Sequence, residues 1–380
     1  MGNTVSVKNF GAAGNGLQDD SIAFQQALDC GAAVVKVPYG RYKIGKPLII
    51  GSDTKITASR GAVIFLADGA CTTVKDFLLT NKDHENGNVN IAVEGGVWDG
   101  GNTGNRRNDD IFDQKGYTGV MMNFFNIKGL RLSNMKLCDS ESYFVRLGNV
   151  DDFTVNNIEF EAVHLRPNQD GIHLAGFCSN GTVENISASM TGSTNDDMIA
   201  LNADDEVNRL VNLGVKRGPI SNIKVKNIYA ANCHTFIRLL SVHSRISGVT
   251  IENVSGGCRV FAINMDAARY CRTPLFKEAD EPLGVGDVEN VTISNLTVHK
   301  TMVNKNPLIL IETNLKNFRI ENFTRERTKE PENTLPTFAA GKMKPVTLRI
   351  NGKGLPAAHN ERVERNDDYF REILFTAAEE

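Results

Sequence analysis

The sequence predicts an all-β fold, a right-handed parallel β-helix (a solenoid) with an N-terminal capping helix. The first observation is a pattern, apolar-x-apolar-x-Asn-apolar, that recurs along the middle of the chain. The second is that these segments are short strands with period-two apolar residues, which cannot bury their apolar face alone but can do so when stacked. The third is composition, because 34 glycines and 7% aromatic residues suit many turns and thin strands.

The repeated asparagines mark the coils of the solenoid. Their spacings are 23, 28, 42, 26, 42 and 27 residues, so one unit is reused with occasional long insertions. We expect each Asn to end a strand, to point inward and to hydrogen-bond to the Asn of the next coil, about 4.8 Å away. The asparagines are Asn134, Asn157, Asn185, Asn227, Asn253, Asn295 and Asn322.

Residues 5–33 are expected to form the N-terminal cap. Asp20 or Ser21 can cap a helix that ends at Cys30. Such a helix covers the open end of a solenoid, which otherwise exposes apolar residues and unpaired strand edges. The apolar residues at helical spacing are Ile22, Phe24, Ala27 and Leu28.

The coils are expected over about residues 34–350, which makes the whole chain, 1–380, one β-helix domain. Polar residues 102–117 predict a loop on the rim, and the Asn repeats run to about residue 325. The charged, Pro-containing segment 326–345 predicts a crossing loop. A C-terminal tail, about 351–380, is expected to contain a short helix at 367–377. Strands are expected at 34–37, 42–44, 48–50, 55–59, 62–66, 90–93 and 346–350.

Charge and targeting signals narrow the classes of partner. The net charge is −3, which does not suggest nucleic acid, and no apolar run reaches the length of a membrane span. The first residues lack the pattern of a secretory signal peptide.

The seven cysteines match no zinc pattern and are expected to be small buried hydrophobes, with a disulfide between coils as the alternative. A solenoid with capped ends is expected to be a monomer.

A second strand in each coil is expected to place polar side chains in columns on the outside. Alternation turns inward the apolar residues Val145, Ile172, Ile199 and Ile237. It turns outward one column formed by Arg146, His173 and Arg238. A neighbouring outward column is formed by Tyr143, Asp170 and Asp197.

Three aspartates are the candidate catalytic groups. Asp170 and Asp197 would lie one coil apart, and Asp196 stands at a strand entry where faces need not alternate. Three carboxyls in one small volume cannot all ionise normally, so one is expected to keep a proton. Acid–base cleavage of a glycosidic bond needs one protonated carboxyl as the acid and one ionised carboxylate as the base. In an inverting enzyme the acid and the base lie roughly 6.5–9.5 Å apart. A Ca²⁺ site or an ordinary solvated face are the alternatives.

Several segments carry a family resemblance from about residue 5 to 325. They are residues 10–20, 96–101 and 139–146, together with Asn168-Gln-Asp170 and Asp196-Asp197. In these the chain resembles the polygalacturonase family of glycoside hydrolases, family 28, within the pectate-lyase-like β-helix superfamily. The last two resemble that family's Asn-Thr-Asp and Asp-Asp motifs. The resemblance implies that Asp196 is the general acid, that Asp170 and Asp197 hold and deprotonate the attacking water, and that no metal or cofactor is used.

The same resemblance favours an extracellular or periplasmic location and a polysaccharide or oligosaccharide substrate related to pectin. Two motifs depart from it: His-Gly reads His234-Thr235, and Arg-Ile-Lys has no clear counterpart, the coil reading Phe261-Ala-Ile-Asn264. Arg238 could replace the missing arginine. The residues expected to bind substrate are Asn168, His173, His234, Arg238, Arg146 and Tyr143. Competing functions are a polysaccharide lyase acting by β-elimination and a non-catalytic glycan-binding β-helix.

Overall fold

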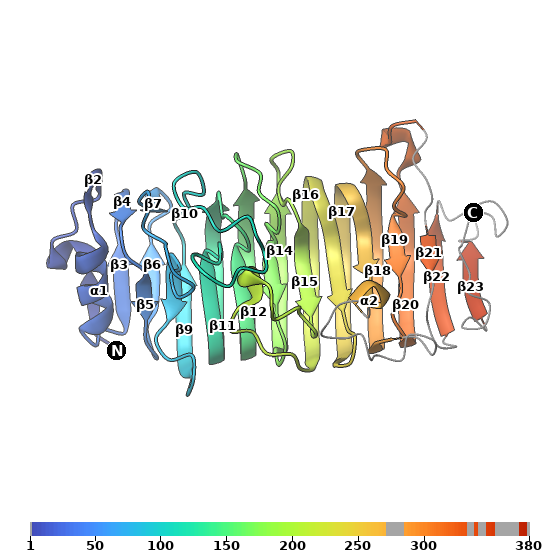
Figure 1. Cartoon of the computed structure of the whole chain (residues 1–380), viewed down its shortest axis with the longest axis horizontal. Coiled ribbons are helices and arrows are strands. Elements are labelled where there is room, and N and C mark those ends of the chain that lie inside the picture. Colours follow the sequence, from blue (N-terminus) through green and yellow to red (C-terminus); the bar gives the residue numbers. More distant parts are fainter. Residues whose placement is uncertain (1, 271–284, 333–337, 341–346, 354–371, 378–380) are drawn as a thin grey trace.

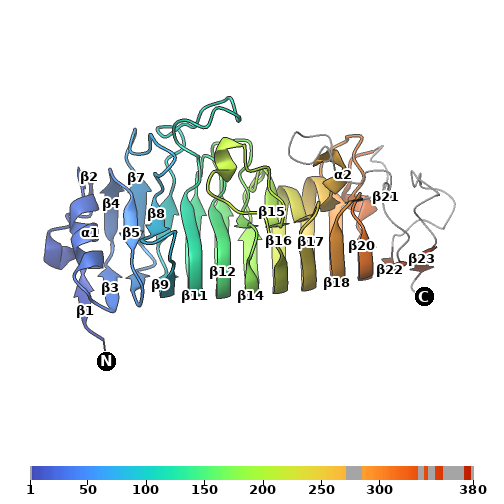
Figure 2. The ribbon, with the colours of Figure 1, turned by 60° about the horizontal axis from the view of Figure 1, so that its bottom comes forward.

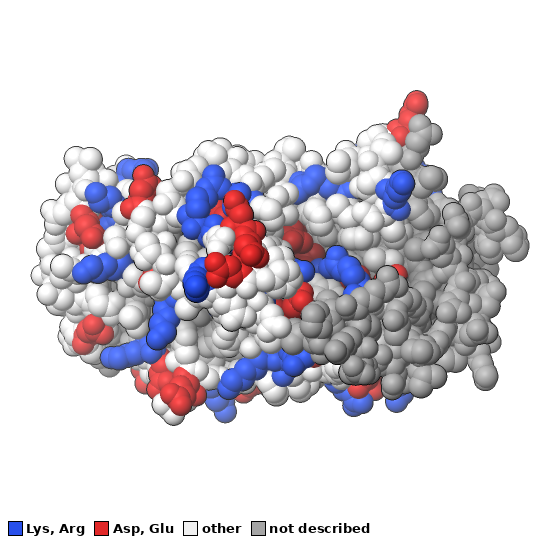
Figure 3. Space-filling model, viewed as in Figure 1, with Lys and Arg blue, Asp and Glu red and all other residues white. Residues whose placement is uncertain are grey.

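The computed structural model describes residues 2–270, 285–332, 338–340, 347–353 and 372–377. Parallel strands stack one above another along the long axis, from the N-terminal to the C-terminal end (Figure 1). This confirms the predicted all-β fold, a right-handed parallel β-helix. Within the described residues, no helix is long and apolar enough to cross a membrane. On the face in Figure 3, acidic and basic side chains are interspersed over the middle of the molecule.

The strands are β1 (Thr4–Ser6), β2 (Asn15–Asp19), β3 (Val34–Val37), β4 (Gly40–Ile44), β5 (Leu48–Ile50), β6 (Lys55–Ala58), β7 (Ala62–Leu66), β8 (Leu79–Asn81), β9 (Asn88–Glu94), β10 (Val97–Asp99), β11 (Met122–Cys138), β12 (Val145–Glu161), β13 (Ile172–Leu174), β14 (Ser179–Ala188), β15 (Asp197–Asn202), β16 (Ile220–Leu240), β17 (Arg245–Met265), β18 (Asp287–Lys300), β19 (Ile309–Ile311), β20 (Leu315–Arg325), β21 (Phe338–Ala340), β22 (Thr347–Lys353) and β23 (Glu372–Ala377). The helical elements are η1 (Val7–Phe10), α1 (Ser21–Asp29), η2 (Leu210–Asn212), α2 (Ala267–Tyr270) and η4 (Arg327–Lys329).

The N-terminal cap is built around α1, which lies over the end of the first coils (Figure 1). Phe24, Ala27 and Leu28 are buried against them, whereas Ile22, predicted on the same apolar face, is 64% exposed. Asp20 precedes the helix but makes no capping bond. Its carboxylate instead accepts hydrogen bonds from the backbone N–H groups of Ala13 and Gly14, at 2.6 and 3.0 Å. The residue therefore holds the preceding turn rather than the helix.

The asparagine ladder exists, but on the outside of the solenoid. From Asn134 to Asn322 each repeated Asn has a φ between 54° and 60°, the left-handed region that Asn tolerates better than other side chains. Their side-chain amides join neighbouring coils at 2.8–3.0 Å, with one step, from Asn185, made to Asn156 instead of Asn157. The predicted inward direction was wrong because the Asn turns the chain at a corner, where its side chain points away from the core.

A second column of left-handed residues stands five positions before the first. It consists of Gly129, Asp152, Asn180, Asn222, Gly248, Asn290 and Asn317. A four-residue strand between two such corners, for example 223–226 between Asn222 and Asn227, forms one wall of the coil. The repeat thus contains two turns, and the sequence pattern identified only the second.

The core fills the inside of the stack. Val145, Ile172, Ile199 and Ile237 are fully buried and pair in register from coil to coil, as the alternation predicted. The six described cysteines are free, and four of them are buried. Loops after β10 and β15, together with α2, gather along one edge of the stack (Figure 2).

The C-terminal region differs from the prediction in part. Within the expected crossing loop, η4 and β21 form, and β21 pairs with β19. The predicted strand at 346–350 is β22. The predicted helix at 367–377 is wrong over its described part, because Glu372–Ala377 forms β23 and pairs in parallel with β22. The run Ile373-Leu-Phe-Thr376 contains β-prone residues, which suits a further rung of the sheet. Residues 367–371 lie outside the described part.

Candidate active site

The outward column is in register across six rungs of one sheet. Thr80 pairs with Asn123, Asn123 with Arg146, Arg146 with His173, His173 with Ala200, and Ala200 with Arg238. Parallel neighbours lie about 4.8 Å apart, so these positions form a continuous strip along the solenoid. The predicted order of Arg146, His173 and Arg238 is therefore confirmed.

Asp170 and Asp197 lie on adjacent rungs beside this strip, at the entry of β13 and β15. The backbone N–H of Gly171 donates to the Asp197 carbonyl at 2.8 Å, which fixes the two segments side by side. The Asp170 and Asp197 residues are 3% and 2% exposed. Oδ1 of Asp197 is buried and has no hydrogen-bond partner in the described part of the protein, so this oxygen is able to accept a bond from a water or a ligand.

Asp196 is the most accessible of the three aspartates, with 22% of its side chain exposed. Asn168 donates to its Oδ2 at 3.3 Å, and Arg107 in turn donates to Oδ1 of Asn168 at 3.1 Å. Nδ1 of His234 lies 3.7 Å from Oδ1 of Asp196. Asn168 and His234 are therefore placed to orient the partly exposed Asp196 carboxyl.

His173 is clamped between two carboxylates and is fully buried. Its Nδ1 lies 2.7 Å from Asp170 and its Nε2 lies 2.9 Å from Asp205. The ring of Tyr143 stacks on it, with centroids 4.0 Å apart and an interplanar angle of 12°. Both ring nitrogens are thus occupied by carboxylates, which fixes His173 beside Asp170, and its role as a substrate-binding residue stays a prediction.

Arg238 closes the other side of the cluster. Its guanidinium lies 3.8 Å from Asp197 and donates to Asp266 at 2.8 Å and to the Tyr270 hydroxyl at 2.9 Å. The residue is 8% exposed. One amino group is thus held by the protein, whereas the buried Nε has no hydrogen-bond partner among the described residues, and the guanidinium places a fixed positive charge beside Asp197.

Tyr143 and Arg146 face outward from the coil but are covered by the insertion after β15. The Tyr143 hydroxyl donates to Asn212 at 2.9 Å, and an Arg146 amino group donates to the Val211 carbonyl. They are 4% and 1% exposed. Their outward direction follows from strand alternation, but alternation does not predict that a loop covers them.

Burial and charge shift the acidities in the cluster. Burial and the Asp196 carboxylate raise the pKa of Asp170 to about 7, against the opposing effect of His173. Burial and Asp196 also raise the pKa of Asp197, while Arg238 opposes the rise. Burial alone would lower the pKa of His173, but Asp205 and Asp170 raise it to about 9. The cluster therefore retains a proton near neutral pH next to a positively charged imidazolium.

Sequence reasoning missed two groups. Asp205 contacts His173 although it lies 32 residues further along the chain. The only sequence signal for this residue is that it directly follows an outward strand. Arg259 is fixed by Asn195 at 2.6 Å and by the Asn232 carbonyl at 2.8 Å, on the coil after His234, and its charge acts on Asp196. Arg259 lies two residues before the segment Phe261-Ala-Ile-Asn264, in which no clear counterpart of the Arg-Ile-Lys motif was found.

The cluster could also hold a cation. An oxygen of Asp196, an oxygen of Asp197 and a ring nitrogen of His234 lie within 4.8 Å of one another. Two carboxylates and a neutral imidazole form a plausible donor set for a divalent ion, and burial lowers the pKa of His234 in spite of the nearby Asp196. The same residues therefore fit either acid–base chemistry or metal binding.

Comparison with known proteins defines the class first. The family model described as rhamnogalacturonase A/epimerase, pectate lyase-like, matches residues 4–93. Two solved structures share the fold: a family 28 exopolygalacturonase from Yersinia enterocolitica (TM-score 0.57, 14% identity, 93% of this chain and 72% of that chain) and the surface adhesin PfbA of Streptococcus pneumoniae (TM-score 0.57, 14% identity, 92% and 87%). The chain therefore resembles pectate-lyase-like proteins over residues 4–93, and the two solved structures share its parallel β-helix fold.

Within this class, the predicted resemblance to the polygalacturonase-like proteins of family 28 is confirmed. A probable polygalacturonase from Arabidopsis thaliana is 25% identical over 312 residues, which cover 76% of this chain. The match spans 63% of that relative's length, so less than two thirds of it is represented.

Proposed function

We propose that the protein is a glycosidase that hydrolyses O-glycosidic bonds in a pectin-related polysaccharide or oligosaccharide. The observation that carries the proposal is the cluster of Asp170, Asp196 and Asp197 at the edge of an outward strip, with one buried Asp197 oxygen unpartnered. Similarity to polygalacturonases supports the reaction class and the substrate class.

In the proposed mechanism Asp196 protonates the leaving oxygen, because it is the most exposed of the three carboxyls. Asp170 and Asp197 bind the attacking water between them and take its proton, the free Asp197 oxygen being one acceptor. His173 and Arg238 stabilise the negative charge of these two carboxylates.

The proposed stereochemical outcome is inversion. The nearest Asp196 and Asp197 oxygens, within 4.8 Å, are closer than the roughly 6.5–9.5 Å usual between an inverting acid and base. Inversion therefore requires water attack from the Asp170 side, away from Asp196. Proton NMR of the first product formed distinguishes the two outcomes, since retention of the anomeric configuration would overturn this part of the proposal.

A cation-assisted polysaccharide lyase is the second candidate, favoured by the donor set of Asp196, Asp197 and His234. One experiment separates the two reactions: a reducing-end assay across pectic glycans, with the ultraviolet absorbance of unsaturated products recorded in the same wells. The glycosidase gives new reducing ends without absorbance and keeps its activity after chelation. Absorbance that grows with turnover and disappears with a chelator would replace hydrolysis by elimination.

A further inference from the structure

Asp205 is a buried carboxylate that lies behind the three candidate catalytic aspartates and has no part in the mechanism proposed above. It stands at the start of the insertion that follows β15 and is 3% exposed. Its Oδ2 lies 2.9 Å from Nε2 of His173, and its Oδ1 accepts a hydrogen bond from Asn202 at 3.0 Å. A buried carboxylate is costly unless it is paired, so its partner His173 determines what this residue does.

His173 links Asp205 to Asp170. Its second ring nitrogen, Nδ1, lies 2.7 Å from Oδ2 of Asp170. An ionised carboxylate only accepts hydrogen bonds, so a ring that bonds to two of them donates from both nitrogens and is positively charged. Burial lowers the pKa of His173, but Asp205 and Asp170 outweigh this effect and raise that pKa to about 9, which favours the charged ring.

The imidazole is held in this orientation by its neighbours. The ring of Tyr143 stacks on it, with centroids 4.0 Å apart, and the Tyr143 hydroxyl is bonded to Asn212. In the sheet, His173 pairs in register with Arg146 on one side and with Ala200 on the other. The stacked ring therefore keeps one nitrogen toward each of its two carboxylates.

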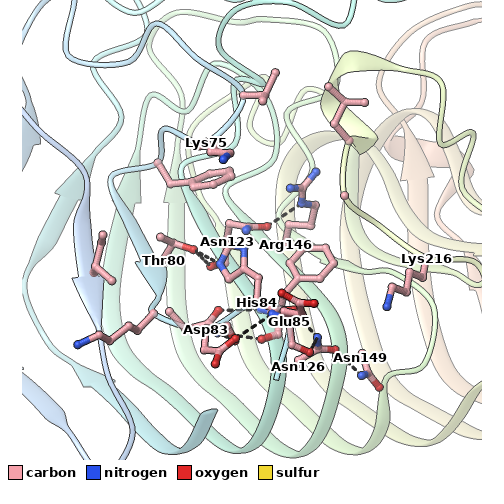
Figure 4. Close-up of a pocket in the computed structure, with 18 of the residues that line it drawn as sticks. Lys75, Thr80, Asp83, His84, Glu85, Asn123, Asn126, Arg146, Asn149 and Lys216 are labelled. Atoms are coloured by element: carbon pink, nitrogen blue, oxygen red, sulfur yellow. Dashed lines mark hydrogen bonds between the residues drawn. The ribbon is translucent and has the colours of Figure 1, made fainter. Parts of the chain in front are cut away.

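The other charged groups nearby do not replace the imidazole. The ionisable groups that act on Asp170, His173 or Asp205 from neighbouring elements are Tyr143, Arg146, Asp196, Asp197, Arg209 and Arg238. Figure 4 shows Arg146 beside Asn123, to which its Nε donates at 2.8 Å. Arg238 donates to Asp266 at 2.8 Å. Among the described residues, His173 is thus the one cation that hydrogen-bonds to the Asp170 carboxylate.

We propose that Asp205 is a positioning residue that acts through His173. It keeps the imidazole protonated on both nitrogens, and the imidazole keeps Asp170 ionised and oriented toward the attacking water. This inference rests on the proposed function, in which Asp170 takes a proton from that water. Because Nδ1 of His173 occupies Oδ2 of Asp170, the other oxygen is left for the water, and the positive ring offsets the repulsion by Asp196.

The first test is NMR of the substrate-free protein, with nitrogen-15 in the histidine rings and carbon-13 in the aspartate carboxyls. Spectra of His173→Gln and Asp170→Asn assign the signals. At about pH 7.5 both ring nitrogens of wild-type His173 are expected to carry a proton. In Asp205→Asn the ring is expected to lose one of these protons, and the titration midpoint of Asp170 to rise by about one pH unit or more.

Asp204→Asn is the matched control. Asp204 is the adjacent residue and is 1% exposed, but its carboxylate accepts from the backbone N–H groups of residues 242–244 and does not contact His173. We expect this variant to change the stability of the protein and to leave the His173 and Asp170 signals unchanged. Adding Asp205→Asn to His173→Gln is also expected to leave the Asp170 midpoint unchanged, because the effect of Asp205 passes through the ring.

The second test is the pH profile of kcat/KM. In Asp205→Asn the acid limb is expected to move to higher pH by the same amount as the Asp170 midpoint. A merely structural defect would lower the profile without moving this limb, and that result would overturn the proposal.

Two NMR results would also overturn it. One is a wild-type His173 ring with a single proton at about pH 7.5, which is decisive even if Asp205→Asn does not fold. The other is an equal Asp170 midpoint in the wild type and in folded Asp205→Asn. Absence of hydrolysis by the wild type would contradict the proposed function alone, because the ring and carboxyl signals are measured without substrate and still decide this inference.

Discussion

At the scale of single residues, the protein concentrates ionisable groups where the coil face is least solvated. Asp170, Asp197 and His173 are all nearly or fully buried, and each is held by a partner of opposite charge. Buried charges of this kind stabilise a fold poorly compared with apolar packing, so their retention together indicates a chemical role. The main consequence of this burial is that the cluster keeps a proton near pH 7.

The pH dependence of activity tests that consequence. The pKa of Asp170 is raised to about 7, so its protonated form predominates below that pH. Since the proposed mechanism needs the ionised Asp170 carboxylate to take the proton of the attacking water, we expect kcat/KM to rise by up to about tenfold per pH unit as the pH approaches about 7. Initial rates across a buffer series measure it. A kcat/KM that falls as the pH rises toward 7 would mean that the protonated form of Asp170 is the active one.

His173 should make the folding stability pH-dependent. Its pKa is raised to about 9, above the roughly 6.5 of an unfolded chain, so its stabilisation is complete below about 6.5 and is lost as the pH rises through about 9. We expect His173→Gln to remove up to about 3 kcal/mol of this pH dependence. Chemical denaturation at several pH values measures the free energy of unfolding. Parallel curves for the two proteins would show that the imidazolium is not stabilised.

Much of the residue-level site could be predicted, and the limits have a physical cause. Local motifs and alternation correctly placed Asp170, Asp197 and Arg238 on neighbouring rungs. The burial of Tyr143 and the contact of Asp205 with His173 depend on how a long insertion folds back over the coil. These contacts follow no repeat in the sequence, so the spacing of residues does not predict them.

At the scale of elements, the corner asparagines connect sequence to coil. The repeat was recognised, but each Asn was expected to point inward and to hydrogen-bond there to the Asn of the next coil. The positive φ values show a different reason for Asn, namely that the turn needs a left-handed residue and the amide ladder then joins exposed corners. A pattern of residue types alone does not separate these two roles.

Asn253 tests the dual role. It has a φ of 60°, donates to Asn227 at 2.9 Å and accepts from Asn295 at 3.0 Å. We expect Asn253→Ala to lower the free energy of unfolding by about 1–3 kcal/mol, because Ala is strained there and both bonds are lost. Asn253→Gly removes the bonds without the strain and should cost less. Denaturant titration ranks the two variants, and equal costs would mean that the backbone conformation contributes nothing.

At the scale of the whole molecule, the stack has ends that must be covered. The predicted N-terminal helix is present as α1, whereas a C-terminal helix was predicted where β23 continues the stack. Both segments are short, and the deciding factor at the C-terminal end is the adjacent sheet edge. The edge of β22 offers backbone partners that a short helical propensity cannot match.

Phe24 tests the capping role of α1. The residue is 1% exposed, and Phe24→Ala is expected to cost about 3–5 kcal/mol and to promote association through the uncovered first coil. Ile22→Ala is the matched control, because Ile22 lies on the same helix and is 64% exposed. Thermal unfolding followed by light scattering compares them. Equal behaviour of both variants would show that the helix does not seal the end of the solenoid.

The central claim is that three aspartates hydrolyse a glycosidic bond with Asp196 as the acid. Its most direct test is kcat/KM of Asp196→Asn on the best substrate of the glycan screen, beside Asp29→Asn, a half-exposed aspartate of the cap. The proposed mechanism predicts a loss of about 10²–10⁴-fold for Asp196→Asn and none for Asp29→Asn. Activity of Asp196→Asn within a few-fold of the wild type would contradict it.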